Sequence, residues 1–261
     1  MKTMKLLLFL AVMMLPGVNA SAQTSNSLRG DANGDGVVNA ADIVEIVNII
    51  LTGGNMAPAG VEAVDLGLPS GTLWANMNVG AFKAEDYGDY FAWGETTPQN
   101  DNQYSWASYR WCKGSEKTLT KYCYDSSYGY NGFTDRKTVL DAKDDAATAN
   151  WGGDWRMPTK AQFDELIDNT TSEMTTQNGV YGRQFTSKTN GNSIFLPGAG
   201  YRRNDERGGV DAGWYWSSTL SEERWTERAW FLFFQSGDMS MHEKTDTYRY
   251  NGYSVRPVRK N

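Results

Sequence analysis

A run of twelve residues near the N-terminus constrains the structure of this chain most. The order of its side chains is rarely found outside calcium-binding loops. The segment Asp31–Asp42 carries side-chain oxygens at loop positions 1, 3, 5, 9 and 12, and Gly36 stands at the sharp turn of position 6. Ca²⁺ prefers six to eight oxygen ligands on a tight loop. The segment predicts one Ca²⁺ site, formed by the Val37 carbonyl and the side chains of Asp31, Asn33, Asp35, Asn39 and Asp42. The alternative is a solvated turn rich in Asn, Asp and Gly.

A helix is expected directly after this loop, from residue 41 to residue 51, and Gly53 and Gly54 end it. Its side chains are apolar around most of its circumference. Such a helix cannot bury its apolar surface alone. It must pack on the rest of the chain, on a second copy, or on another protein.

Loop and helix together resemble one repeat of a dockerin, the calcium module that docks onto cohesin scaffolds. Asp42 at position 12, where calmodulin-like sensors carry Glu, follows the dockerin pattern. The resemblance covers residues 23–55 and implies a cohesin-like partner. A full dockerin has two such repeats and this chain shows one, which weakens the case for cohesin docking.

The first 22 residues have the layout of a signal peptide. Lys2 and Lys5 precede the apolar run Leu6–Leu15, and Ala20-Ser21-Ala22 is a cleavage site of the A-x-A type. An uncleaved membrane anchor is the alternative, but the run is short for a bilayer span. We therefore expect a secreted protein, extracellular, cell-surface or periplasmic, with no membrane span in the mature chain.

Composition limits the remaining 200 or so residues to a few classes. The net charge of −6 argues against a nucleic-acid partner, which would favour a basic surface. The chain has ten Trp, fourteen Tyr and 27 Gly, and long apolar runs are absent after the N-terminus. This mixture favours an α+β fold with short antiparallel strands, two helices and long loops. We expect a linker at 56–60 and one large domain at 61–261.

Several elements of the large domain can be located. Thr159 and Gln162 form a capping box before a helix with an apolar stripe, and 144–150 is expected to be a shorter helix. Strands are expected at 72–79, 89–93, 193–196 and 253–258, and residues 99–130 are expected to be mostly loops. Residues 230–241 predict a hairpin with one buried face.

Four stretches of the large domain resemble one family in order and spacing. They are Val64–Ala75, Tyr90–Glu95, Trp151–Thr159, and Tyr215–Ser218 together with Ser254–Val258. They are similar to the Fibrobacter succinogenes major paralogous domain, over roughly residues 64–259. The resemblance implies a C-type-lectin-like fold, like that of formylglycine-generating enzymes and phage variable proteins. We expect Arg156 and Arg256 to bind backbone carbonyls or carboxylates.

No catalytic constellation is recognisable, so we expect no enzyme. His242 is the only histidine, which disfavours Ser-His and Cys-His arrangements. The formylglycine-generating enzymes use two late cysteines, whereas Cys112 and Cys123 lie early in the domain. Export would allow these two to form a disulfide, and two buried free thiols are the alternative. The calcium-dependent sugar motifs of animal lectins are absent.

The C-terminal third is the expected ligand-binding region. The hairpin register places Phe231, Phe233 and His242 on the face opposite the core residues, between two polar stretches. Aromatic side chains with a polar rim are typical of recognition surfaces. A loop of the same domain covering both Phe side chains is the alternative. The candidate ligand-binding residues are Trp214, Glu222, Arg224, Trp225, Arg228, Phe231, Phe233, His242, Lys244 and Tyr248.

These observations favour a secreted or cell-surface, non-catalytic binding protein that recognises a protein or a glycan. Two alternatives remain. The first is a structural subunit of a surface complex that docks through the dockerin-like helix. The second is a target protein of a diversity-generating retroelement, because the phage-like relatives vary in their C-terminal stretch.

Overall fold

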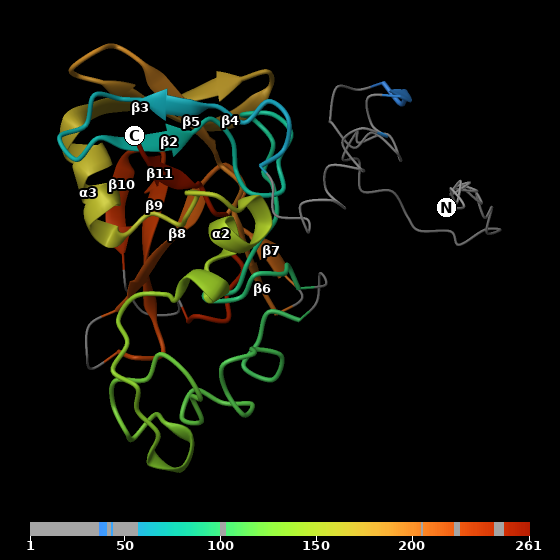
Figure 1. Ribbon diagram of the computed structural model, residues 1–261, viewed down its shortest axis with the longest axis vertical. Helices are drawn as coiled ribbons and strands as arrows, with labels where there is room; N and C mark the ends of the chain where they lie inside the picture. Colours follow the sequence, from blue (N-terminus) through green and yellow to red (C-terminus); the bar gives the residue numbers. More distant parts are fainter. Residues whose placement is uncertain are drawn as a thin grey trace, which may run out of the picture.

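The computed structural model describes residues 37–40, 43, 57–99, 103–204, 206–221, 225–242 and 248–261. The predicted signal peptide and most of the predicted calcium loop and helix therefore lie outside the described residues. The described part of the large domain is a mixed α+β structure of small antiparallel sheets, few helices and long loops (Figure 1).

Among the described residues, three sheets of three strands and one two-stranded hairpin form the framework, and all strand pairs within them are antiparallel. The first sheet has the order β1 (Ala63–Asp65), β2 (Thr72–Ala75), β11 (Val258–Lys260). The second has the order β3 (Thr170–Gln177), β4 (Val180–Ser187), β5 (Ser193–Pro197). The third has the order β10 (Asp238–His242), β9 (Ala229–Gln235), β8 (Gly213–Leu220), and β6 (Tyr201–Arg203) pairs with β7 (Glu206–Gly208).

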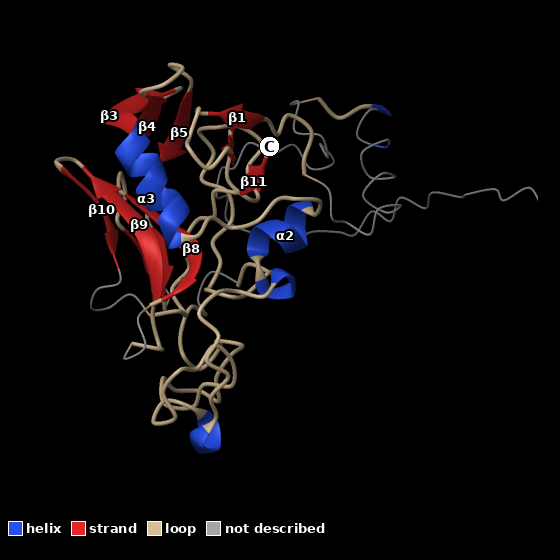
Figure 2. Ribbon diagram, turned by 60° about the vertical axis from the view of Figure 1, so that its left-hand side comes forward, coloured by secondary structure: helices blue, strands red, loops and turns tan. Residues whose placement is uncertain are grey.

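Helix α3 (Lys160–Asn169) lies along the β8–β9–β10 sheet (Figure 2). Its predicted capping box is confirmed, because Thr159 accepts a hydrogen bond from the Gln162 amide and the Gln162 side chain accepts one from the Thr159 amide. Phe163 and Leu166 are fully buried against the sheet. The expected shorter helix is α2 (Ala146–Trp151), and the Asp145 side chain caps it through the Thr148 amide.

The predicted hairpin is also confirmed, with Met239 opposite Phe234 and Ser240 opposite Phe233. Strand β8 extends it, since Trp214 lies opposite Phe233 and Trp216 lies opposite Phe231. Because side chains alternate along a strand, Leu232 and Phe234 face α3 while Phe231 and Phe233 face the other way.

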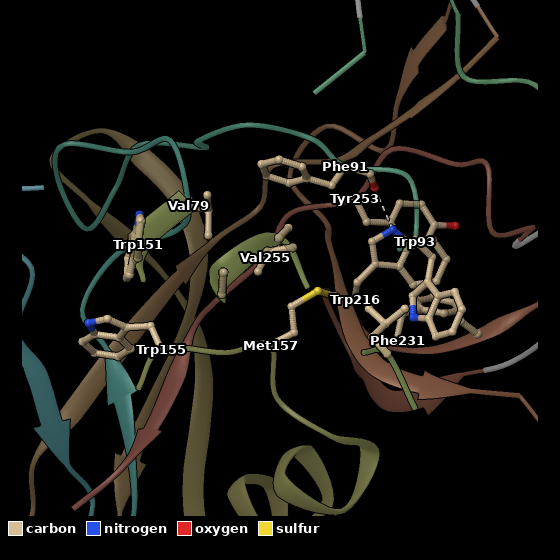
Figure 3. Packing of buried hydrophobic residues seen from close by; sticks show 14 of the residues in the cluster. Val79, Phe91, Trp93, Trp151, Trp155, Met157, Trp216, Phe231, Tyr253 and Val255 are labelled. Atoms are coloured by element: carbon tan, nitrogen blue, oxygen red, sulfur yellow. Dashed lines mark hydrogen bonds between the residues drawn. The ribbon is translucent and has the colours of Figure 1, made fainter. Parts of the chain in front are cut away.

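The interior has three apolar clusters on different sides of these elements. One cluster fills the space between the β8–β9–β10 sheet and the segments 75–93, 146–157 and 253–255 (Figure 3). A second lies between the same sheet, α3 and the β3–β4–β5 sheet. A third lies under the long loops and is dominated by Tyr and Trp side chains. The β8–β9–β10 sheet is thus covered on both faces.

Two expected strands were placed wrongly. The strand at 89–93 is reduced to one bridge between Phe91 and Tyr253, and the closing strand begins only at Val258. The expected strand at 72–79 ends at Ala75, and that at 193–196 is β5. The hairpin β3–β4 was not expected. Its turn, Asn178-Gly179, has positive φ angles of 47° and 85°, as two-residue hairpin turns require.

The residues on both sides of the predicted boundary at residue 61 contact the large domain. Asn76 donates its side-chain Nδ2 hydrogen to the Gly60 carbonyl at 3.0 Å, and the Glu62 backbone amide donates to Asn76 Oδ1 at 3.0 Å. Ala57 packs against the first apolar cluster. Residues 57–60, predicted as a linker, are therefore bonded to or packed on the domain.

Candidate functional site

Two of the six predicted calcium ligands lie among the described residues. Asn39 donates its side-chain Nδ2 hydrogen to the Val37 carbonyl oxygen at 3.2 Å. A carbonyl oxygen has two lone pairs, and the Asn39 amide has an Oδ1 acceptor, so both residues carry oxygen atoms of the kind that Ca²⁺ binds. Both residues fit the predicted calcium loop. Asp31, Asn33, Asp35 and Asp42 lie outside the described residues.

The expectation that Phe231 faces solvent is wrong. Its side chain is only 3% exposed. The ring lies 5.9 Å from Trp216 and 5.3 Å from Tyr253, and the Trp216 Nε1 hydrogen is donated to the Phe91 carbonyl at 2.8 Å (Figure 3). The segment around Tyr253 covers this face of the sheet, so alternation along β9 separates two buried faces instead of a core face and a solvent face.

Trp214 and Phe233 are half-buried at the margin of the same cluster. Their ring centroids lie 4.9 Å apart, and Tyr201 lies 5.0 Å from Trp214 at an angle of 72°. One tilted and one edge-on ring contact of this kind are typical of structural aromatic packing. The two residues lie together as predicted, but they pack on the β6–β7 hairpin and not on the loops that carry the other candidates.

A second group of the predicted residues does meet, on the side of the long loops. The Arg228 guanidinium lies 4.5 Å from the Trp225 ring and 5.9 Å from the Tyr248 ring. Tyr248 stacks on Tyr250 at 5.6 Å, and Trp106 lies 5.5 Å from Tyr248. Trp106 was not predicted as a site residue, because only the tertiary structure brings it to the C-terminal loops.

Two charged side chains next to this group are buried. Glu227 is 2% exposed, and its Oε1 lies 3.2 Å from Arg228 Nε. Its Oε2 has no hydrogen-bond partner among the described residues. Burial raises the pKa of the Glu227 carboxyl. Arg249 is fully buried between the Trp93 and Tyr109 rings, each 5.5 Å from its guanidinium, and it donates to the Tyr122 carbonyl at 2.8 Å.

Of the four remaining candidates, three lie outside the described residues, namely Glu222, Arg224 and Lys244. His242 lies at the end of β10, where its Cα pairs with that of Phe231.

Both cysteines are free in this structure, which is the second of the two alternatives. The Cys112 thiol donates to the Trp106 carbonyl at 3.1 Å, and the Cys123 thiol donates to the Asp125 carbonyl at 3.1 Å. Burial raises the pKa of both thiols. A buried thiol with a raised pKa is a poor nucleophile, because the thiolate is the reactive form.

Comparison with known families identifies one part of the chain. Residues 29–67 match the family model of the dockerin type I domain. No curated protein and no solved structure matches the chain. The matched segment contains all six predicted calcium ligands, and its last residues, 57–67, include β1 and the fully buried Leu66 of the large domain. Among the described residues, no helix is long and apolar enough to cross a membrane.

Proposed function

We propose that this protein is an exported, non-catalytic binding protein that attaches to a cohesin-like receptor through its calcium-loop segment. The match of residues 29–67 to the dockerin type I family carries the proposal. That segment holds the full ligand spacing from Asp31 to Asp42. When Ca²⁺ is bound, it orders the loop and thereby fixes the start of the helix that follows.

The apolar side chains of this segment support an external partner. Val37, Val38 and Ile43 are 57%, 54% and 57% exposed, so the large domain does not cover them. Exposed apolar surface of this kind is typical of protein contacts. Residues 57–67 of the matched segment are part of the large domain, which leaves one calcium loop for docking.

For the large domain we propose the C-type-lectin-like fold and membership of the Fibrobacter succinogenes major paralogous domain family. Several residues of the resembling motifs are core residues: Trp74, Trp93 and Trp216 are all fully buried. Long loops on small antiparallel sheets are compatible with that fold. A more specific form of this proposal is that the protein is the target of a diversity-generating retroelement.

A second function, ligand recognition by the large domain, is favoured by the meeting of Trp225, Arg228 and Tyr248 with Trp106. Binding residues concentrate on loops held by a rigid scaffold. Half-buried aromatic rings next to charged groups offer both stacking and hydrogen bonding to a ligand. The long loops, and not the face around Phe231, are therefore the proposed recognition side.

Docking is tested with the full mature chain and a panel of immobilised cohesin modules, in Ca²⁺ and in EDTA. We expect binding that requires Ca²⁺ and that Asp35→Ala abolishes, because this variant removes a predicted ligand. Glu62→Gln removes an exposed carboxylate outside the loop and should bind normally. Absence of binding to every module, or equal binding in EDTA, would refute the docking function.

A further inference from the structure

Residues 103–137 form a lobe built almost wholly of loops, which we call the loop lobe (the green to yellow-green segment in Figure 1). Its one regular element is the short helix η1 (Tyr130–Gly132). The lobe is joined to the proposed recognition side, because Tyr124 donates its amide hydrogen to Thr226 Oγ1 at 2.9 Å and Trp106 contacts Tyr248. The lobe thus continues the surface that residues 225–228 and Tyr248 begin.

The backbone of the lobe is held by specific hydrogen bonds. The Asp135 carboxylate accepts hydrogen bonds from the amides of Tyr122 and Cys123, each at 2.9 Å, and of Lys137 at 3.2 Å. Leu119 joins the two main turns, since its amide donates to the Tyr128 carbonyl and its carbonyl accepts from the Tyr130 amide, both at 2.8 Å. The lobe therefore presents its side chains on a fixed frame, which lowers the entropy lost on binding.

Two aromatic side chains of this frame are open to solvent. Tyr130 is 45% exposed and Phe133 is 37% exposed, and both belong to the turn that η1 forms. Rigid exposed aromatic rings are typical contact residues, because they offer a large apolar face with few rotatable bonds. Their position beside the 112–119 turn is fixed by the Leu119 hydrogen bonds.

The charge of the lobe is opposite to that of the chain. Residues 103–137 contain six Lys and Arg and three Asp and Glu, a formal charge of +3, whereas the whole chain carries −6. The acids are largely used inside the lobe: Asp135 binds backbone amides, and Asp125 Oδ1 accepts from the Ser127 amide at 2.8 Å. These hydrogen bonds leave both carboxylates ionised, so the lobe keeps its formal charge of +3.

Five of the six cations of the lobe are exposed, whereas Lys121 is only 13% exposed and pairs with Asp141 and Asp144. Arg110 and Arg136 are exposed and lie over the half-buried rings of Trp111 and Tyr124, at 4.8 and 5.7 Å. Lys113 and Lys117 are exposed in the turn that ends at Leu119, whose carbonyl binds the Tyr130 amide. In the described part of the chain neither lysine pairs with a carboxylate. Exposed ammonium groups and exposed rings on two joined turns suit a ligand with both anionic groups and apolar faces.

We infer that the loop lobe binds an anionic polysaccharide whose sugars carry carboxylates, with Tyr130 and Phe133 against the pyranose faces and Lys113 and Lys117 on the carboxylates. This inference rests on the second proposed function, ligand recognition by the large domain, and not on docking. A polyuronate has the required chemistry, since each sugar offers an apolar C–H face and one carboxylate. Nucleic acid fits less well. Its phosphates carry a dense negative charge, and proteins that bind it have a surface that is basic overall, whereas this chain carries −6.

The test measures binding of the full mature chain, in Ca²⁺, to polygalacturonate and to the same polymer with its carboxylates methyl-esterified. We expect binding to polygalacturonate only, weakened by added salt because the contacts are exposed charges. Lys113→Glu with Lys117→Glu, and separately Tyr130→Ala with Phe133→Ala, should each lower the affinity by about tenfold or more. The matched control is Phe82→Ala with Lys83→Glu, which changes an exposed aromatic ring and an exposed lysine outside the lobe and should bind normally.

Three outcomes would overturn the inference. They are equal binding of the esterified polymer, equal loss of binding in the control variant, and preferential binding of duplex DNA. Absence of binding to polygalacturonate would overturn it as well. Docking to cohesin modules, measured on the same lobe variants, should be unchanged, so a failure of glycan binding is distinguishable from a failure of docking.

Discussion

Arg256 donates its Nε hydrogen to Asn78 Oδ1 at 2.8 Å, and neither side chain is exposed to solvent. The same guanidinium donates to the carbonyls of Ala75 at 3.1 Å and Phe195 at 2.9 Å. Burial lowers the pKa of Arg256 to about 10, and no carboxylate pairs with it in the described part of the chain. One buried cation therefore joins the end of β2 and the middle of β5 to the segment before β11, and it binds backbone carbonyls as expected from the sequence.

Replacement of this arginine should destabilise the whole domain. Arg256→Met fills much of the same volume but leaves three buried oxygens without these donors, and each such loss costs about 1–3 kcal/mol. We expect the free energy of unfolding to fall by roughly 3 kcal/mol or more. Urea unfolding followed by Trp fluorescence measures it, and Arg259→Met, at an exposed position, is the control. Similar stability of the two variants would contradict the structural role.

Phe231 should behave as a core residue. Phe231→Ala removes a ring that contacts Trp216 and Tyr253, and such truncations cost about 3–5 kcal/mol. Tyr130→Ala removes a ring that is 45% exposed and should change stability by about 0.5 kcal/mol or less. Chemical denaturation of both variants decides between a buried and a solvent-facing position. An unchanged stability for Phe231→Ala would restore the solvent-facing interpretation.

Glu227 should make the stability of the domain depend on pH. Burial raises the pKa of its carboxyl, while Arg228 and Arg249 oppose the shift and Glu116 adds to it. The folded form then binds more protons than the unfolded form between the two pKa values, so stability falls as pH rises through that interval. Glu227→Gln removes this loss. We therefore expect the melting temperature of the variant, relative to the parent, to rise from pH 5 to pH 8.

Thermal unfolding at both pH values measures this difference. Glu62→Gln, which changes an exposed carboxylate, should show no such trend. The melting temperature of Glu227→Gln minus that of the parent could instead stay constant or decrease as pH rises. Either result would show that burial does not destabilise the ionised Glu227 carboxylate.

The mature chain should bind one Ca²⁺ through the loop from Asp31 to Asp42. Isothermal calorimetry should give a binding heat that Asp35→Ala removes and Glu62→Gln retains. Because the ion orders only its own loop, EDTA should leave the main unfolding transition of the large domain in place. A parent protein without a binding heat would disprove the calcium site.

The domain boundary can be tested with a pair of truncated chains. A fragment from Ala57 keeps the contacts of Gly60 and Glu62 with Asn76, together with β1, and should unfold cooperatively. A fragment from Leu68 lacks β1 and the fully buried Leu66, and its melting temperature should be clearly lower. Equal stability of the two fragments would place the boundary after β1.

Local patterns were sufficient for the elements that short-range interactions specify. The capping box at Thr159 needs only Gln162 three residues later, and it begins α3 as predicted. The alternation from Phe231 to Met241 fixes which side chains share a face, and the hairpin has that register. The spacing of Asp31 to Asp42 predicted a calcium repeat, and the dockerin type I match to residues 29–67 supports it.

The tertiary structure decided what covers each face. Alternation along β9 places the side chains of Phe231 and Leu232 on opposite faces of the sheet. Both are buried only because Tyr253, 22 residues further along the chain than Phe231, covers the Phe231 face. Likewise, the nine aromatic residues of the loop lobe give no strand or helix period. Five of them, Tyr104, Trp106, Tyr109, Trp111 and Tyr128, join the same apolar cluster as Tyr248 only through contacts between distant loops. The sequence by itself determined the order of side chains along each element, because neighbouring residues set backbone geometry. Only the tertiary structure decided exposure, because exposure depends on segments that the chain brings together from far apart.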